Sequence, residues 1–224
     1  MTGVAQRVIL AWGWRRSLIA FLAGAAGALA MPPFGFLPAL ALSLTVAVWL
    51  IDGAAAGRGR LLATLRSTAV VGWWWGFGYF VAGLWWLGAA FLVEAEQFAW
   101  ALPFGVLGLP AGLAVFPACG FALARCIWSP GAGRIFALAF GLTVSEWLRG
   151  TLFTGFPWNT LGMALAQNGW LMQAGSVVGL YGLTVLAVLI CAAPATLGTG
   201  SDLGSRMTAP AAALAGLATL ALFG

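Results

Sequence analysis

The stretch STAVVGWWWGFGYFVAGLWWLGAAF, residues 67–91, contains no charged side chain. About 20 consecutive apolar residues cross the hydrocarbon core of a bilayer as a helix, and a longer run can cross at a tilt. The rest of the chain is similar, because 62% of its 224 residues are hydrophobic and only 7% are charged. A soluble domain has about 25% charged residues. The sequence therefore predicts an integral membrane protein.

Seven apolar runs between the charged positions are candidate membrane spans: 17–31, 33–51, 67–91, 97–124, 135–149, 171–193 and 207–224. Met31-Pro32-Pro33 is expected to end the first run, because proline disfavours helix in the residue before it. Pro33 is then expected in the first turn of the second helix. The fold class that we expect over residues 1–224 is an all-α, polytopic membrane bundle of about seven transmembrane helices.

The basic residues predict the orientation of this bundle. All ten are Arg, and nine fall on one side of the seven-span arrangement: Arg7, Arg15, Arg16, Arg58, Arg60, Arg66, Arg125, Arg134 and Arg206. Arg149 falls on the other side, together with Glu94 and Glu96. By the positive-inside rule the N-terminus is cytoplasmic, and seven crossings leave the C-terminus outside.

A cleaved signal peptide is the alternative at the N-terminus. Arg15-Arg16, an apolar stretch and Ala28-Leu29-Ala30 follow the pattern of a signal sequence with a small-residue cleavage site. A second apolar run follows at once, however, and Pro32 and Pro33 lie at the second and third positions beyond the supposed cut. These two observations favour an uncleaved first helix.

The composition also excludes several kinds of chemistry. The chain has no His and no Lys, which excludes Ser-His-Asp catalysis, His metal sites, Schiff bases and phosphate-binding P-loops. Cys119, Cys126 and Cys191 have no metal-site or redox-motif spacing, and we interpret them as packing residues. We expect no metal and no cofactor. The scattered Arg residues also give no sign of a nucleic-acid partner.

The segment SEWLRGTLFTGFPWN, residues 145–159, places a carboxylate and a guanidinium in this apolar chain. Glu146 and Arg149 are three residues apart, so both can lie on one helical face and form an ion pair. Charges at membrane depth often mark function, but a purely structural pair at the end of a span remains the alternative. Pro157 and its neighbours predict an apolar turn, which serves either as an interfacial anchor or as part of a lipid entrance.

Small residues also recur every four positions, a spacing that lets helices approach closely in lipid. They predict packing inside the bundle at Ala20, Gly24 and Ala28; Gly72 and Gly76; Gly108 and Gly112; and Gly175 and Gly179.

Four stretches in the same order resemble one known family. Residues 145–159 resemble the (S/T)EWLRG and TGFPW segment of bacterial apolipoprotein N-acyltransferases. MPPFGFLPALALSL (31–44), GWWWGFGYFVAGLWWL (72–87) and QAGSVVGLYGLTVL (173–186) are similar to three further segments of that family. One departure is Gly162-Met163-Ala164, where the family often has Gly-Tyr-Ala.

The resemblance implies an enzyme of the bacterial inner membrane. It transfers an acyl chain from a phospholipid donor to the N-terminal amine of a diacylated lipoprotein, the last step of lipoprotein maturation. It also implies eight helices, with a periplasmic nitrilase-like domain between the seventh and eighth that contains a Glu-Lys-Cys triad. No residue of this Lys-free chain matches that triad. We therefore expect a membrane portion that lacks the catalytic domain and the final helix and is inactive alone.

Within that portion, we expect Arg149, Phe156, Pro157 and Trp158 to line the route by which lipid reaches the catalytic domain. The alternative is a membrane scaffold or small transporter without enzymatic activity. A transporter is expected to have ionisable residues at membrane depth on several helices, or helices broken at the midplane.

Overall fold

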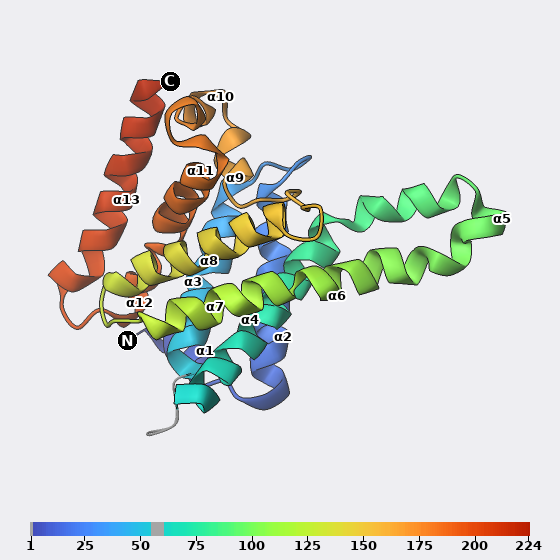
Figure 1. Ribbon diagram of the computed structural model, residues 1–224. Coiled ribbons are helices and arrows are strands. Elements are labelled where there is room, and N and C mark those ends of the chain that lie inside the picture. Colours follow the sequence, from blue (N-terminus) through green and yellow to red (C-terminus); the bar gives the residue numbers. More distant parts are fainter. Residues whose placement is uncertain (1, 55–60) are drawn as a thin grey trace.

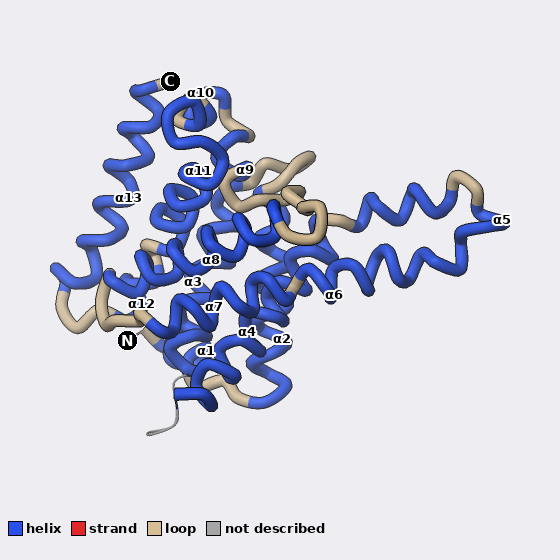
Figure 2. Tube along the Cα trace, viewed as in Figure 1, coloured by secondary structure: helices blue, strands red, loops and turns tan. Residues whose placement is uncertain are grey.

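The structure is a computed structural model that describes residues 2–54 and 61–224, and every described element is a helix or a turn (Figures 1 and 2). The longer helices are α2 (Gly13–Gly27), α3 (Leu37–Ala54), α4 (Leu61–Gly83), α7 (Val115–Cys126), α8 (Gly133–Thr151), α11 (Gly175–Ala192) and α13 (Leu203–Phe223). The shorter ones are α1 (Gly3–Ile9), η1 (Ala28–Ala30), η2 (Trp85–Leu92), α5 (Ala95–Phe98), η3 (Ala99–Ala101), η4 (Phe104–Gly108), α6 (Leu109–Leu113), α9 (Met163–Ala166), α10 (Gly169–Met172) and α12 (Ala195–Thr199). The expected all-α fold is confirmed.

Among the described residues, four helical segments are long and apolar enough to cross a membrane: Leu37–Ala54, Ala95–Cys126, Gly175–Thr199 and Leu203–Phe223. Two bent pairs raise this number to six if each pair is one span: Gly3–Ile9 with Gly13–Ala30, and Leu61–Gly83 with Trp85–Leu92. Helix α8 covers the fifth expected span but contains Arg134, Glu146 and Arg149, and it is outside this set. The described residues therefore contain four to six candidate spans, and the count of seven stays a prediction.

Several expected boundaries were wrong. Helix α3 begins at Leu37, so Pro38 rather than Pro33 lies in its first turn. Residues 31–36 form a turn in which Gly35 has a φ of +60°. The charge-free run 67–91 is not one straight helix, because α4 ends at Gly83 and η2 follows at a bend of 51°. At Gly83 a Cβ atom would lie 2.1 Å from Nδ2 of Asn159, so the chain turns where a distant loop packs against it.

The C-terminal helices also differ from expectation. Helix α11 begins at Gly175 rather than residue 171, and α13 begins at Leu203 rather than 207. Asp202 caps α13, because its Oδ1 accepts a hydrogen bond of 2.8 Å from the Ser205 backbone N–H. That hydrogen bond also lowers the pKa of Asp202 from its ordinary value. The cap starts the helix in a segment whose Gly, Ser and Thr content suggests a loop.

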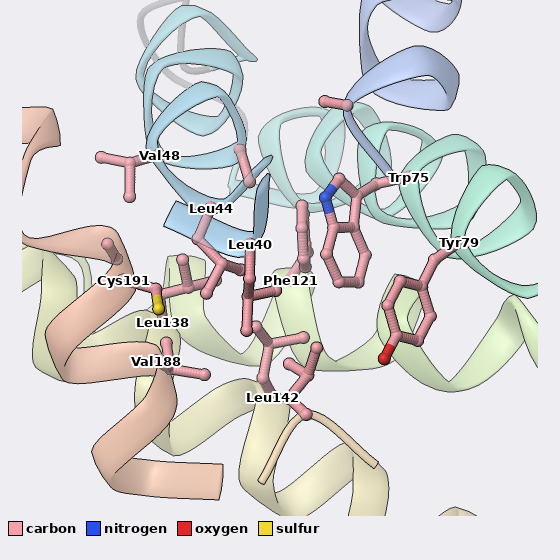
Figure 3. Packing of buried hydrophobic residues seen from close by; sticks show 14 of the residues in the cluster. Leu40, Leu44, Val48, Trp75, Tyr79, Phe121, Leu138, Leu142, Val188 and Cys191 are labelled. Carbon is pink, nitrogen blue, oxygen red and sulfur yellow. The ribbon is translucent and has the colours of Figure 1, made fainter. Parts of the chain in front are cut away.

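The core lies where α3, α4, α7, α8 and α11 meet, and Figure 3 shows its packing. Trp75 stacks on Tyr79 with 5.4 Å between ring centroids, and Phe121 of α7 packs against Trp75 at 5.6 Å. The indole N–H of Trp75 donates a hydrogen bond of 2.9 Å to Ser43 Oγ. Two of the stretches that suggested the family, 31–44 and 72–87, therefore meet in the core.

The small-residue prediction holds at some positions only. At Gly24 a Cβ atom would lie 1.9 Å from the Trp75 backbone oxygen, and at Gly76 it would lie 2.5 Å from Pro117. These glycines permit close approach between α2 and α4 and between α4 and α7. At Gly112 and Gly179 an added Cβ would meet nothing within 4 Å, so their spacing reflects no close packing.

The described Arg residues divide between the two ends of the bundle. We use "Arg-rich end" for the start of α2, the end of α3, the start of α4, the end of α7 and the starts of α8 and α13. These contain Arg15, Arg16, Arg66, Arg125, Arg134 and Arg206, and Arg7 lies nearby in α1. Arg58 and Arg60 lie outside the described residues. Arg149 lies at the end of α8 farther from Arg134. The described Arg residues are thus concentrated at one end of the bundle, as the positive-inside rule requires of the cytoplasmic end. The orientation itself stays a prediction.

Hydrogen bonds tie the Arg-rich end together. Arg134 pairs with Asp52 and also donates to Thr199, and the Trp128 indole N–H donates to Asp52 at 3.0 Å. These contacts join α3, α8 and α12.

At the other end, η2, α5, η3 and η4 form a long hairpin that projects from the bundle (Figure 1). Its exposed side chains are mostly apolar, including Trp85, Phe98 and Trp100.

Candidate functional site

The segment that follows α8, residues 152–162, is an irregular loop with an unusual backbone. Gly155 has a φ of +82°, and a Cβ atom there would lie 2.4 Å from the Gly150 backbone oxygen. Phe153, Thr154 and Asn159 also have positive φ angles, of 51°, 74° and 54°. Non-glycine residues rarely adopt this region and keep it only where the surrounding structure holds them. The contacts that hold this loop are therefore informative.

The buried side chain of Arg149 binds the backbone of this loop through hydrogen bonds. Its Nη1 donates hydrogen bonds of 2.5 Å to the Phe156 backbone oxygen and 2.7 Å to the Trp158 backbone oxygen. The guanidinium also lies over the Phe80 ring, 5.1 Å from its centroid. Only 2% of Arg149 is exposed. The side chain therefore points into the bundle and fixes the backbone of the turn.

Glu146 binds two distant segments. Its Oε1 accepts a hydrogen bond of 2.8 Å from the Leu161 backbone N–H, and its Oε2 accepts one of 2.8 Å from Thr184 Oγ1. Thr184 Oγ1 in turn accepts from the Gly162 backbone N–H at 3.1 Å. The contact with Arg149 is longer, 3.9 Å between Nη2 and Oε1. The nearest partners of the carboxylate are thus in the loop and in α11, not in its own helix.

Tyr79 completes the set of buried groups beneath the loop. Its hydroxyl donates a hydrogen bond of 2.9 Å to the Asn159 backbone oxygen. Spacing along α8 could not identify Tyr79, Phe80 or Thr184 as members of this cluster. Their one signal in the sequence is that they lie within 72–87 and 173–186, two of the stretches that resemble the family. Three such stretches therefore converge on one site.

The loop also borders an apolar cavity of about 730 Å³. The cavity lies between α6 and α7 on one side and the end of α8 with the loop on the other. Arg149 and Phe156 line it, together with Phe116, Cys119 and Leu148. Pro157 and Trp158 do not line this cavity. Both are exposed, and Trp158 packs edge-on against Trp86 at 6.0 Å between centroids.

This arrangement can bind and orient an apolar chain, but the described residues that line the cavity include no acid–base pair. Cys119, Ser145 and Thr154 are the side chains in the lining with a thiol or hydroxyl group, and no carboxylate lies among the described residues that line the cavity. A Lys is absent from the whole sequence. In the described part of the chain, no three His, Cys, Asp or Glu side chains gather as metal ligands. The site is thus suited to binding rather than to proton transfer.

Comparison with known proteins identifies the family. Residues 23–193 match the family model described as "Apolipoprotein N-acyltransferase N-terminal domain". The chain is 53% identical over 225 residues to the apolipoprotein N-acyltransferase of Rhodopseudomonas palustris, covering 100% of this chain and 41% of that protein. For the Rhizobium rhizogenes protein of that name, identity is 56% over 200 residues, covering 89% of this chain and 38% of the relative. For the Agrobacterium fabrum protein, identity is 51% over 225 residues, covering 100% and 42%.

The chain thus spans about two fifths of the length of these relatives. The matched region includes all of the buried cluster, from Tyr79 through Glu146 and Arg149 to Thr184. On this match, the chain belongs to the apolipoprotein N-acyltransferase family.

Proposed function

We propose that this chain is the membrane portion of an apolipoprotein N-acyltransferase of the bacterial inner membrane. The complete enzyme would move an acyl chain from a phospholipid to the N-terminal amine of a diacylated lipoprotein. The family membership supports this activity. Because the chain has no Lys, the Glu-Lys-Cys chemistry implied by the family would come from a nitrilase-like domain outside these residues.

The role that we assign to this portion is to guide the acyl chain of the lipid. The observation that supports it best is a strained loop, held by buried Arg149, Glu146 and Tyr79, at the edge of an apolar cavity. Arg149 is a positioning residue, since it contacts the loop backbone. Phe156 contributes to the cavity wall, while Pro157 and Trp158 form the outer surface of the entrance.

The test is Trp158→Ala in the full-length protein. Aromatic contacts contribute roughly 0.5–1.5 kcal/mol beyond their buried area, so acyl transfer should fall about two- to tenfold while protein abundance changes little. Trp170→Ala is the matched control, because Trp170 is also exposed but lies outside the loop and the cavity lining. Equal losses of activity and abundance in the Trp158 variant would support a purely structural loop instead.

A scaffold or small transporter is the second candidate. One observation favours it, since α11 is broken at Gly179, whose φ is +66° and ψ −178°. The break lies only four residues from the start of the helix rather than at its middle. Translation of the gene beyond codon 224 separates the two functions. An in-frame nitrilase-like domain with Glu, Lys and Cys supports the enzyme, and a stop codon with stable expression supports the alternative.

A further inference from the structure

A second cavity lies at the Arg-rich end of the bundle, away from the loop at 152–162. Its volume is about 820 Å³, and it lies between the start of α2 and the N-terminal part of α4, from Leu61 to Val71. Arg16 and Ser17 of α2 and Arg66 and Ser67 of α4 provide its polar wall. The role proposed above for acyl transfer does not account for the Arg and Ser side chains in this cavity.

The guanidinium of Arg16 is fixed in the cavity wall. Its Nε donates to the Ala11 backbone oxygen at 2.8 Å and its Nη2 to the Gly53 backbone oxygen at 3.1 Å. Its Nη1 donates to Ser67 Oγ at 3.3 Å. These bonds use three of the five N–H donors of the guanidinium, so two remain for a ligand. The positive charge is therefore already positioned without a bound anion.

Among the described residues that line the cavity, none has an acidic side chain that would neutralise this charge. Among residues 2–54 and 61–224, the ion pairs are Arg134 with Asp52 and Arg149 with Glu146, so neither Arg16 nor Arg66 takes part in one. Asp52, the acid in α3 at this end, already accepts from Arg134 and Trp128. The cavity thus combines two Arg side chains and two Ser hydroxyls with no carboxylate in its wall.

The two helices add to the positive potential. They run in the same direction, because Arg16 contacts Ser67 near their starts and Ala28 lies near Gly83 at their ends. The positive ends of both helix dipoles therefore point toward the cavity. The first turn of α2 also has no side-chain cap from Trp12. An anion in this cavity would be stabilised electrostatically by both helix dipoles and by both Arg side chains.

The other wall of the cavity is apolar and faces outward. Leu62 and Val70 line it and are exposed, as a surface in contact with acyl chains would be. Trp12 and Trp14 are exposed at the start of α2, where an aromatic residue marks the membrane interface. A lipid phosphate beside Arg16 and Arg66 would place its acyl chains along this apolar wall.

We propose that this cavity binds an anionic phospholipid in the leaflet at the Arg-rich end. Basic pockets between membrane helices recognise anionic headgroups in this way. The lipid differs from the acyl donor in place and purpose, because it occupies the end of the bundle opposite the 152–162 loop. It anchors α2 and α4 in their leaflet and is not consumed.

The experiment uses the full-length protein in nanodiscs of phosphatidylcholine with a minor fraction of phosphatidylglycerol. After extraction, the retained lipid is identified and counted by native mass spectrometry. Arg66→Gln should lower the retention of phosphatidylglycerol about fivefold, as expected from the loss of one Arg near a lipid phosphate. Arg15→Gln is the matched control, because it removes the same charge one residue from Arg16 but outside the cavity lining. Equal losses in both variants would overturn the proposal.

Two further measurements test the cavity itself and the kind of anion. Ala63→Phe adds bulk at a lining position without changing charge, and it should lower phosphatidylglycerol retention while leaving the thermal unfolding midpoint close to wild type. Unchanged retention would contradict a site in this cavity. Inorganic phosphate at millimolar concentration should not displace the lipid, because it lacks the acyl chains. Displacement by phosphate would overturn the assignment to a lipid.

Discussion

At the residue scale, Glu146 and Arg149 are close neighbours in α8, yet each side chain finds its nearest partners elsewhere. Glu146 binds Leu161 and Thr184, while Arg149 binds the Phe156 and Trp158 carbonyls. The two charges balance each other at 3.9 Å, and each also holds a separate part of the structure. Removing either one therefore leaves a buried charge without compensation.

Glu146→Gln should lower the free energy of unfolding by about 3 kcal/mol, because breaking one side of a buried charge pair is costly. The measurement is thermal unfolding of the purified protein, with Glu94→Gln as the control at an exposed position of the hairpin. The double variant Glu146→Gln with Arg149→Met should recover part of this loss. Equal shifts for Glu146→Gln and Glu94→Gln would contradict the role of Glu146 in the buried cluster.

At the element scale, the contact between α2 and α4 depends on glycines that bring two backbones together. A Cβ atom at Gly24 would lie 1.9 Å from the Trp75 oxygen, and one at Gly78 would lie 2.0 Å from the Phe21 oxygen. Backbone atoms cannot move aside as a flexible side chain can, so the helices would have to separate. The same two helices frame the cavity at the Arg-rich end.

Gly24→Ala should therefore destabilise the bundle by about 1–3 kcal/mol, the usual cost of overpacking. Gly112→Ala is the matched control, since an added Cβ there meets nothing within 4 Å and alanine favours helix by up to about 1 kcal/mol. Both variants are compared by the midpoint of thermal unfolding in detergent. A midpoint as low for Gly112→Ala as for Gly24→Ala would show that any added methyl group is harmful.

At the scale of the whole molecule, charge is distributed unequally between the two ends of the bundle. Seven described Arg residues lie at or near the Arg-rich end, and Arg149 lies at the other, buried beneath a loop. The C-terminal residue Gly224 approaches Trp170, away from the Arg-rich end. By the positive-inside rule, we predict that the Arg-rich end is cytoplasmic and that Gly224 is periplasmic.

Fusion of alkaline phosphatase after Gly224 should therefore give an active reporter, because this enzyme works only in the periplasm. Fusion after Ser129, between α7 and α8 at the Arg-rich end, should give an inactive one. Colony colour and enzyme assay measure both fusions at matched expression. Activity after Ser129 without activity after Gly224 would reverse the orientation.

Much of the fold was predictable from the sequence, and much of the site was not. The apolar runs indicated most of the long helices, but the bend after Gly83 and the start of α3 at Leu37 were not predicted. At the bend, Gly83 lies against Asn159, which is distant in the sequence from α4. For the site, the charge pattern identified Glu146 and Arg149, whereas Tyr79, Phe80 and Thr184 look like ordinary apolar-helix residues.

The sequence by itself predicted a lipid environment, an all-α fold and Arg residues that gather at one end of the bundle. These features follow from the composition and from the cost of placing charge in lipid. Its four family-like stretches also indicated the family. Only the tertiary structure decided which buried groups bind one another. A polar side chain in a membrane bundle must find a hydrogen-bond partner, but helix packing determines which partner it reaches. For Arg149, packing selected the backbone of the loop 152–162.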